Sequence, residues 1–256
     1  MPMMIPEELK ETARSAAGIV ADELPLIVLT GAGISVGSGI PPFRGPGGLW
    51  DRYDPYEYGH IDTFRKHPER SWKMLKEIID GAILSEPNEA HYAISRMEKE
   101  GWVKPVVTQN IDGLHVVAGT EDLIEIHGNA RRIYCMGCGN KEMLDRGTWD
   151  EFSEICECGS FKRPDIVFFG EQLPEKEMEI AFKAAYTGRS MIVVGTSGVV
   201  QPVAMLPAIV KAQAGRLIEI NLEPTELTVS LSDVFLKTPA EIGMRAIEEA
   251  FRERFS

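Results

Sequence analysis

The sequence predicts an α/β protein built on a doubly wound parallel sheet, and three observations support this fold class. Short apolar runs of the kind that form buried parallel strands recur along the chain. Helical patterns lie between or beside these runs, and several begin at a proline, whose missing N–H would be unpaired in a first helical turn anyway. At 256 residues, the chain is long enough for one large domain that carries a smaller module.

Four apolar runs are expected to form strands, each closed by small or polar residues. They are Leu26–Leu29, Val106–Val107, Met191–Val194 and Leu217–Ile220. Helices are expected after Pro6, after Pro68, at Pro174 and from Pro239 to the C-terminus. Strands that alternate with helices favour a parallel sheet covered on both faces.

Polar residues follow each of these strands. The four segments are Thr30–Gly33, Thr108–Asn110, Gly195–Ser197 and Asn221. Ligands of open parallel sheets bind beyond the carboxyl ends of the strands, near the switch in strand order. Any one segment could be an ordinary turn, but four together predict one shared polar crevice.

Two stretches, residues 45–104 and 128–170, interrupt the alternation of strands and helices. The first opens with the aromatic, turn-rich GPGGLWDRYDPYEYGH and then becomes helical, and the second contains every cysteine of the chain. We expect both to be insertions that together build a smaller domain, one part helical and one part cysteine-containing. The large domain would then comprise residues 1–44, 105–127 and 171–256.

The first strand leads into a Gly-x-Gly turn, Gly31-Ala32-Gly33, which lets a backbone approach a diphosphate closely. The usual dinucleotide-binding motif has a third glycine three positions after the second, where this chain has Val36. The turn is therefore interpreted as a nucleotide loop of a different pattern, with a plain glycine-rich connection as the alternative. The following segment, residues 38–45, is rich in Gly and Pro and is expected to be a shaped loop that covers a ligand.

The four cysteines form two close pairs, Cys135 with Cys138 and Cys156 with Cys158. Four thiolates from two tight turns would close a tetrahedral Zn²⁺ site and leave no position for water, so the metal would be structural. The second pair has only one intervening residue, which shortens the distance that its two thiolates can span around a metal. Reduced cysteines without metal are one alternative, and disulfides, which a cytosolic setting disfavours, are another.

The formal net charge of −12 disfavours non-specific binding to nucleic acid or to an anionic membrane and is compatible with a basic polypeptide partner. No apolar run approaches the roughly 20 residues needed to span a bilayer. The N-terminal sequence lacks the basic and apolar regions of a secretory signal. We therefore expect a cytoplasmic protein.

With these motifs assembled, the sequence resembles the sirtuin family. The matching segments, in order, are GAGISVGSGIPPFRG (Gly31–Gly45), TQNIDGLH (Thr108–His115), His127-Gly128, the cysteine pairs, RPDIVFFGE (Arg163–Glu171), GTSGVVQP (Gly195–Pro202) and INLEP (Ile220–Pro224). The resemblance covers nearly the whole chain. It implies a Rossmann-like large domain and a small zinc-binding domain, with NAD as co-substrate and an acylated-lysine protein entering the cleft between them from opposite sides.

The resemblance also implies a reaction, the NAD-dependent removal of acetyl or other neutral acyl groups from protein lysines. Nicotinamide leaves, the acyl oxygen attacks the ribose anomeric carbon, and a histidine then activates a ribose hydroxyl that attacks the resulting imidate. His127 matches this base, and an imidazole pKa near ~6.5 suits proton exchange around neutral pH. Asn110 and Asp112 match the catalytic residues of the nicotinamide pocket.

Further site residues follow from the resemblance. The NAD-binding residues would be Gly31, Ala32, Gly33, Ser35, Phe43, Arg44, Gln109, Asn110, Ile111, Asp112, His127, Gly195, Thr196, Ser197, Asn221, Leu222, Glu223 and Ala240. The substrate peptide would add as a strand between two edges, formed by Val167, Phe168, Phe169, Gly170 and Glu171 and by Gly198, Val199 and Val200. His60, His67, His91 and His115 are expected to be surface or structural residues.

Relatives that prefer acidic acyl groups carry a Tyr and an Arg three residues apart, and here Leu75 and Ile78 align with that pair. An apolar pocket cannot satisfy a succinyl carboxylate, so acetyl or longer neutral acyl groups are predicted. Alternatives to the deacylase are a protein mono-ADP-ribosyltransferase, a non-catalytic NAD or ADP-ribose binding module, and a zinc hydrolase, which a closed four-cysteine site disfavours. The sequence leaves the physiological substrate and the oligomeric state undetermined.

Overall fold

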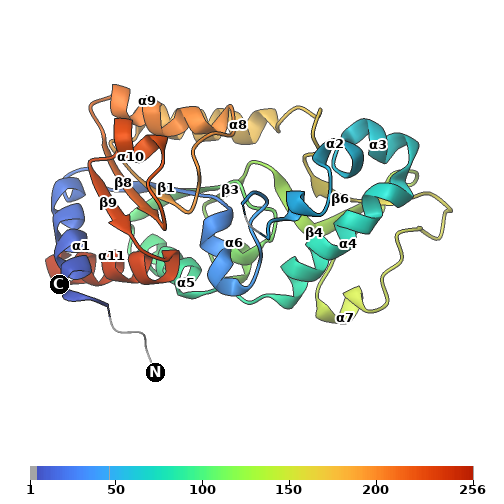
Figure 1. Ribbon diagram of the computed structural model, residues 1–256, viewed down its shortest axis with the longest axis horizontal. Coiled ribbons are helices and arrows are strands. Elements are labelled where there is room, and N and C mark those ends of the chain that lie inside the picture. The colour runs from blue at the N-terminus through green and yellow to red at the C-terminus, as the bar shows by residue number, and fades with distance from the viewer. Residues whose placement is uncertain (1–4, 46, 256) are drawn as a thin grey trace.

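The computed structural model describes residues 5–45 and 47–255; the first four residues, Pro46 and Ser256 lie outside this description. Figure 1 shows a larger part, in which a sheet lies between two layers of helices, and a smaller part beside it that contains its own sheet. Among the described residues, no helix combines the length and the apolar character that a bilayer span requires.

The larger part is built on six strands in the order β3-β2-β1-β7-β8-β9, and every neighbouring pair is parallel. Their bounds are β1 Leu26–Thr30, β2 Val103–Thr108, β3 Leu123–Glu125, β7 Ser190–Val194, β8 Arg216–Asn221 and β9 Val234–Lys237. The four predicted runs are the four central strands. The edge strands β3 and β9 were not predicted, because they are short and only partly buried.

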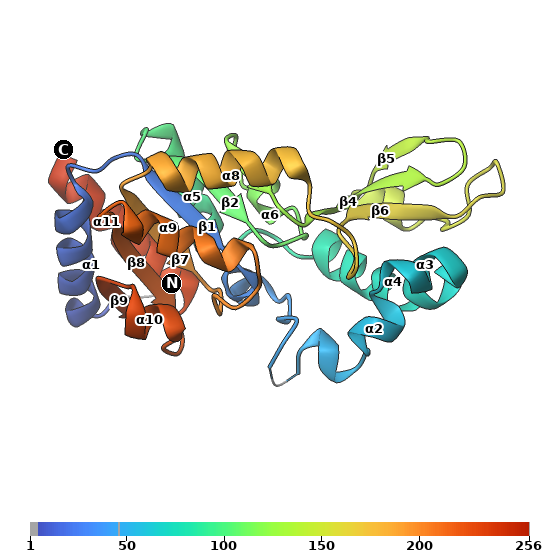
Figure 2. The same cartoon turned by 90° about the horizontal axis from the view of Figure 1, so that it is seen from above.

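Helices cover both faces of this sheet, as Figures 1 and 2 show. On one face lie α1 (Glu7–Val20), α5 (Glu89–Lys99) and α11 (Ala240–Phe255), and on the other α8 (Glu175–Thr187), α9 (Leu206–Ala212) and α10 (Glu226–Ser230). Successive strand residues point to opposite faces, so Val28 packs under the first group and Ile27 under the second. The predicted Rossmann-like, doubly wound sheet is confirmed.

Helix α5 lies within the stretch 45–104 that the sequence assigns to the small domain, but it packs on the large sheet. Ala90, Ala93, Ile94 and Met97 are buried in the same core cluster as the first face of the sheet. The reason is topological, because a crossover between the parallel strands β1 and β2 places a helix against the sheet, and α5 directly precedes β2. The boundary predicted at residue 104 is corrected to lie before α5.

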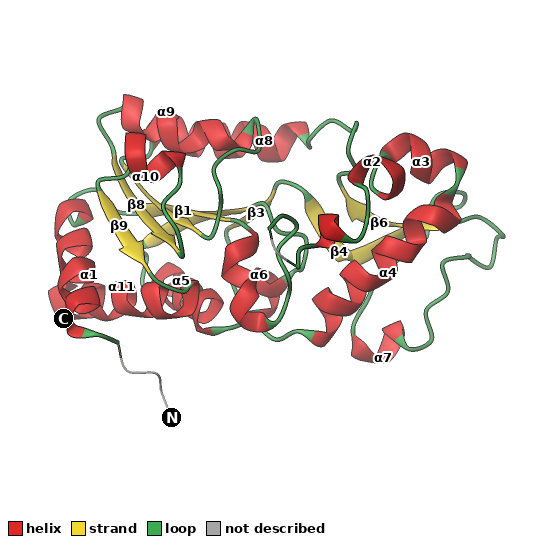
Figure 3. Cartoon of the chain, viewed as in Figure 1, coloured by secondary structure: helices red, strands yellow, loops and turns green. Residues whose placement is uncertain are grey.

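The smaller part combines an antiparallel sheet with helices (Figure 3). Its elements are β4 (Gly128–Cys135), β5 (Lys141–Met143), β6 (Lys162–Ile166), α2 (Pro55–Tyr58), α3 (Ile61–Lys66), α4 (Pro68–Leu84) and α7 (Arg146–Trp149). Phe64, Trp72 and Leu75 are buried in its separate apolar core. The remaining short helices are η1 (Ala32–Ser38), η2 (Leu49–Asp51), α6 (Leu114–Val117) and η3 (Val203–Met205).

The strand order reverses between β1 and β7, and the turns that follow these two strands touch. Gly31 donates its N–H to the carbonyl of Val194, and Gly33 donates to the carbonyl of Gly195, at 3.0 and 2.8 Å. A Cβ built on Gly33 would lie 2.6 Å from the Gly195 Cα. Glycine is therefore required here by direct contact between two backbones.

Gly33→Ala is expected to lower the free energy of unfolding by about 1–3 kcal/mol, because a rigid backbone must move to admit the methyl group. The matched control is Gly18→Ala in α1, where no atom lies within 4 Å of the added Cβ. This control should raise stability by up to about 1 kcal/mol through helix propensity alone. Urea unfolding of both variants tests the pair, and equal stability of Gly33→Ala and the parent would contradict the contact.

Candidate active site

A cavity of about 840 Å³ lies where the carboxyl edge of the large sheet faces the small domain. All four polar segments predicted from the strand ends contribute to it, through Gly31, Gln109, Thr196 and Asn221. The predicted residues that line it are Gly31, Ala32, Gly33, Phe43, Arg44, Gln109, Asn110, Ile111, His127, Val167, Phe168, Phe169, Gly170, Glu171, Gly195, Thr196, Ser197, Val200, Asn221 and Glu223. The strand tips therefore form one crevice, as the sequence predicts.

Thr196 ties three of these strand tips together. Its hydroxyl accepts a hydrogen bond from the Gln109 side chain at 3.0 Å, which joins the ends of β2 and β7. Its carbonyl accepts from the Asn221 amide at 3.1 Å, which adds the end of β8. These bonds orient the polar side chains before any ligand arrives.

Asn110 and Asp112 are both buried, but they occupy different positions relative to the cavity. Asn110 lines it, and its amide nitrogen donates to the Gly31 carbonyl and to the Ser35 hydroxyl, both at 3.1 Å. The carboxylate of Asp112 accepts from the Ser35 hydroxyl at 2.7 Å and from the Leu114 N–H at 2.9 Å. Asp112 therefore fixes Ser35 from behind the cavity wall.

His127 lines the cavity, and one hydrogen bond holds its ring in place. Its Nδ1 lies 2.8 Å from the Gln109 carbonyl, which can only accept, so Nδ1 carries the proton and Nε2 keeps its lone pair. Burial lowers the pKa of His127 below its ordinary value of 6.5, and the bond to Gln109 offsets part of this effect. The neutral imidazole is thus the resting form at neutral pH.

Two other histidines pack against each other behind the strand tips. The rings of His91 and His115 lie 4.9 Å apart, and His115 Nε2 is 3.0 Å from the Thr30 hydroxyl. Burial lowers the pKa of His91 to about 4 and lowers that of His115 as well. Both are neutral interior residues, in agreement with the structural role expected for them.

Several residues expected in the site do not line the cavity. These are Ser35, Asp112, Leu222, Ala240, Gly198 and Val199. Ser35 and Asp112 are buried behind the wall, and Ala240 is buried at the start of α11, whereas Leu222 and Val199 are more than half exposed. These six residues therefore lie outside the wall of this cavity.

The expected acyl-pocket pair needs one correction. Ile78 lines the cavity as expected, but Leu75 is fully buried in the small-domain core and its neighbour Met74 lines the cavity instead. Adjacent helix residues point about 100° apart, so Met74 can face the cavity while Leu75 faces the core.

Sequence reasoning missed other residues around the cavity. Trp50 lines it and lies 5.5 Å from the Phe43 ring and 5.6 Å from the Phe169 ring, which closes an aromatic wall. Its only sequence signal was its place in the aromatic stretch after Gly45. Thr225 also lines the cavity, in a turn that no sequence motif identified.

A buried carboxylate, Glu219 in β8, holds the turn that contains Thr225. It accepts hydrogen bonds from three hydroxyls, those of Thr225 at 2.7 Å, Thr228 at 2.6 Å and Ser232 at 2.9 Å. A fully buried charge requires such compensation. In the sequence Glu219 is only a polar interruption of an apolar strand.

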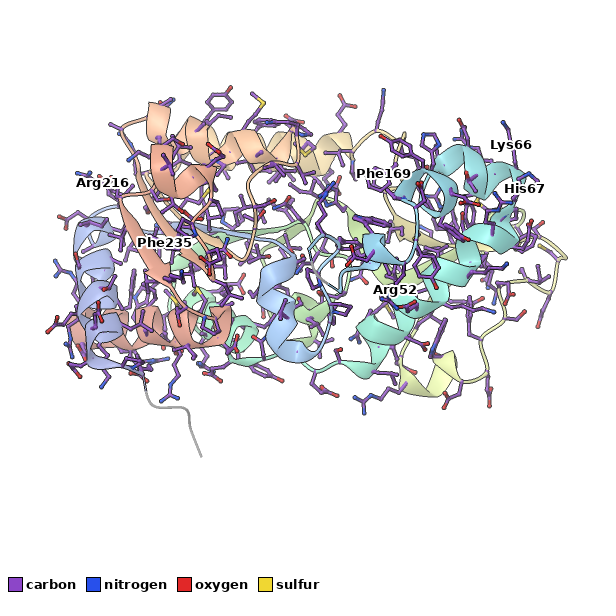
Figure 4. The ribbon with its side chains drawn as sticks, viewed as in Figure 1. Arg52, Lys66, His67, Phe169, Arg216 and Phe235 are labelled. Carbon is purple, nitrogen blue, oxygen red and sulfur yellow. The ribbon has the colours of Figure 1, made fainter. Side chains whose placement is uncertain are left out.

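Two chain segments form open edges on the cavity. In the first, residues 167–171, Val167 donates its N–H to the carbonyl of His127 at 3.0 Å. Phe169, labelled in Figure 4, is 40% exposed beside the cavity. In the second, residues 198–200, the Val199 side chain is 56% exposed. Each segment therefore exposes a side chain to solvent.

The four cysteines are free and converge at the tip of the small sheet. Their sulfur atoms all lie within 4.8 Å of one another, and the Cys135–Cys158 and Cys138–Cys156 separations are 3.4 and 3.8 Å. Four thiolates at ~2.3 Å from Zn²⁺ would be about 3.8 Å apart, so the cluster fits a tetrahedral ion. The single intervening residue of the second pair does not prevent this arrangement.

A doubly wound sheet with a cavity at its switch point, joined to a small domain with a four-cysteine cluster, defines a two-domain nucleotide-binding α/β protein. Comparison with known proteins narrows this class. Residues 31–202 match the model of the Sir2 family. The chain belongs to the Sir2 family.

Curated relatives and solved structures agree with this assignment. The chain is 44% identical over 241 residues to an NAD-dependent protein deacylase of Pyrococcus furiosus, covering 91% of this chain and 96% of that protein. It is 40% identical over 235 residues to an NAD-dependent protein deacetylase of Saccharolobus solfataricus, covering 89% and 92%. A Sir2 homologue solved as an NAD complex superimposes with a TM-score of 0.83 at 37% identity, covering 99% and 96%.

Chelation of the metal, or Cys138→Ser, is expected to lower the melting temperature, because the two cysteine turns have no disulfide to hold them. Metal analysis should give one zinc per chain in the parent and much less in the variant. Adding Zn²⁺ back to the chelated parent is the control and should restore its melting. An unchanged melting temperature after complete zinc removal would contradict a structural metal.

Proposed function

We propose that this chain is an NAD-dependent protein-lysine deacylase, which releases nicotinamide, passes the acyl group to ADP-ribose and leaves a free lysine. The observation that carries the proposal is the position of His127. Its free Nε2 belongs to a cavity wall that also contains the strand tips suited to a dinucleotide. Family membership and the names of the relatives support the same reaction.

The strand tips would hold NAD. The glycines after β1 admit the diphosphate, while Thr196 and Ser197 supply further polar groups at the end of β7. Asn221 and Glu223, beyond β8, would bind the adenosine end. Phe43 lines the same cavity as part of the aromatic wall, where it would shield the reacting ribose from water.

The nicotinamide end would lie against Asn110. The Asn110 amide nitrogen is held by the Gly31 carbonyl and the Ser35 hydroxyl, so its oxygen would be the atom that accepts a hydrogen bond from the ligand. Asp112 would act on this pocket indirectly, because its carboxylate accepts a hydrogen bond from Ser35, and Ser35 contacts Asn110. Its catalytic contribution would therefore be to orient this pocket.

The acyl-lysine would enter from the side of the open edges, residues 167–171 and 198–200. The apolar part of the cavity wall, formed by Trp50, Met74 and Ile78, would receive the acyl chain. His127, at the junction of the two domains, would take the proton of the ribose hydroxyl that attacks the imidate. Zn²⁺ in the cysteine cluster would stabilise the small domain and take no part in the reaction. A cytoplasmic location stays a prediction from the sequence.

The experiment that tests the function is an acyl-lysine peptide panel with and without NAD. Turnover should require NAD and yield nicotinamide and acyl-ADP-ribose. His127→Ala should reduce kcat by about 10²–10⁴-fold because the general base is lost, with NAD binding mostly retained. Transfer of label from NAD to a protein would instead support ADP-ribosylation, and turnover without NAD would support a hydrolase.

His67→Ala is the matched control, since His67 is exposed on the small domain, and it should retain parental activity. The pH profile of the parent adds a further check. Because burial lowers the pKa of His127, the neutral base persists below pH 6.5, and activity should fall only at more acidic pH. Equal kcat in His127→Ala and the parent would overturn the assignment of the base.

The apolar wall predicts the acyl preference. Acetyl and longer neutral acyl groups should be removed with a higher kcat/KM than succinyl, whose carboxylate would have no partner at Met74 and Ile78. Ile78→Arg should raise the succinyl-to-acetyl ratio of kcat/KM by about 10-fold or more through a charge-assisted contact. Ile78→Leu is the control and should keep the parental ratio. Efficient desuccinylation by the parent would contradict an apolar acyl pocket.

A further inference from the structure

An ion pair between a buried arginine and a partly buried glutamate connects the small sheet to the open edge at residues 167–171. Arg163 in β6 is only 6% exposed. Its Nη1 and Nη2 donate to Oε1 and Oε2 of Glu171, both at 2.9 Å, in the two-pronged geometry that gives the strongest charge-assisted contacts. The pair therefore fixes both the distance and the orientation between β6 and Glu171.

The guanidinium has little freedom to move within this site. Its Nη2 also donates to the carbonyl of Ile166 at 2.9 Å. The rings of Phe168, Tyr134 and Phe64 surround it, with centroids 4.8, 5.4 and 5.8 Å from Cζ. Such a planar group, stacked among rings and bonded at its edge, is a rigid anchor that lysine could not reproduce.

Glu171 in turn closes the tight turn 168–171. Its carboxylate accepts from the Phe168 N–H at 3.0 Å, and its own N–H donates to the Phe168 carbonyl at 3.0 Å. Gly170 has φ +83°, which this turn requires. The conformation of the turn thus depends on the carboxylate that Arg163 holds.

The turn leaves a specific set of backbone groups open. Phe169 uses its N–H and carbonyl on the small-domain side, with Gly59 and Ile61, both at 3.0 Å. Within the described ranges, the N–H and carbonyl of Gly170 and the carbonyl of Val167 have no backbone partner. An incoming strand can pair only with such open groups, and only in one register, because a shift of one residue reverses its side chains.

We propose that Arg163 is a positioning residue for the substrate peptide. Through Glu171 it preorganises the turn 168–171, so that the open backbone groups meet an acyl-lysine peptide in the register that directs its side chain into the cavity. This inference rests on the proposed deacylase function. It predicts an effect on the peptide and not on NAD, because the Arg163 side chain donates its hydrogen bonds to Glu171 and to the carbonyls of Pro164 and Ile166, and none of these belongs to the strand tips that would hold NAD.

The test compares Arg163→Met and Arg163→Lys with the parent. KM for an acetyl-lysine peptide should rise about 10-fold in Arg163→Met, while KM for NAD stays within about 2-fold. KM for the peptide should rise less in Arg163→Lys, because lysine keeps the positive charge but loses the two-pronged contact. Arg132→Met is the matched control: Arg132 is in the neighbouring strand β4, pairs with Glu125 and Asp165, and should leave both KM values unchanged.

A double variant separates positioning from folding. Single substitution leaves Glu171 charged, partly buried and unpaired, whereas Arg163→Met with Glu171→Met replaces both charges by apolar groups and should fold stably. Its melting temperature should approach that of the parent while KM for the peptide remains elevated. Peptide affinity measured by fluorescence anisotropy, without NAD or turnover, should weaken in parallel.

A parental KM for the peptide in Arg163→Met or in the double variant would overturn the inference, as would equal increases in the two KM values. These outcomes differ from a failure of the proposed function, in which the parent itself would not consume NAD with an acetyl-lysine peptide. The anisotropy measurement still reports on the turn in that case, because it depends only on peptide binding.

Discussion

The contact between the turns after β1 and β7 is the constraint on which the rest of the site depends. At this point the strand order reverses, so the connections of the two strands leave in opposite directions and open a crevice. Gly33 and Gly195 approach so closely that neither could carry a side chain without displacing the other backbone. The same closeness lets the neighbouring strand tips share hydrogen bonds, as Thr196 does with Gln109 and Asn221.

Several polar groups behind the crevice bond one another, which separates residues that shape the site from residues that face a ligand. Asp112 and Ser35 use their oxygens on each other, and Thr30 bonds both Thr108 and His115. Leaving any of these buried groups unpaired would cost roughly 1–3 kcal/mol, so the network resists rearrangement. His127 differs from these groups because it lines the cavity, with its Nδ1 bonded to the Gln109 carbonyl.

The small domain connects its metal site to the open edge through a short series of contacts. The cysteine cluster holds the ends of β4 and β6 together, and Arg163 follows directly along β6. From Arg163 the contacts pass to Glu171 and to the turn it closes, and Val167 bonds the carbonyl of His127. The cysteine cluster and His127 are thus linked by consecutive contacts along β6 and the segment that follows it.

The sequence by itself determined the four central strands, the polar residues at their ends and the cysteine cluster, because hydrophobic period and short spacing are local properties. Only the tertiary structure decided which surfaces meet. Helix α5 joined the large sheet because of a crossover, and Met74 rather than Leu75 reached the cavity because of helix phase. The pairing of Arg163 with Glu171 was equally hidden, since no local pattern in the sequence shows that these two charges meet.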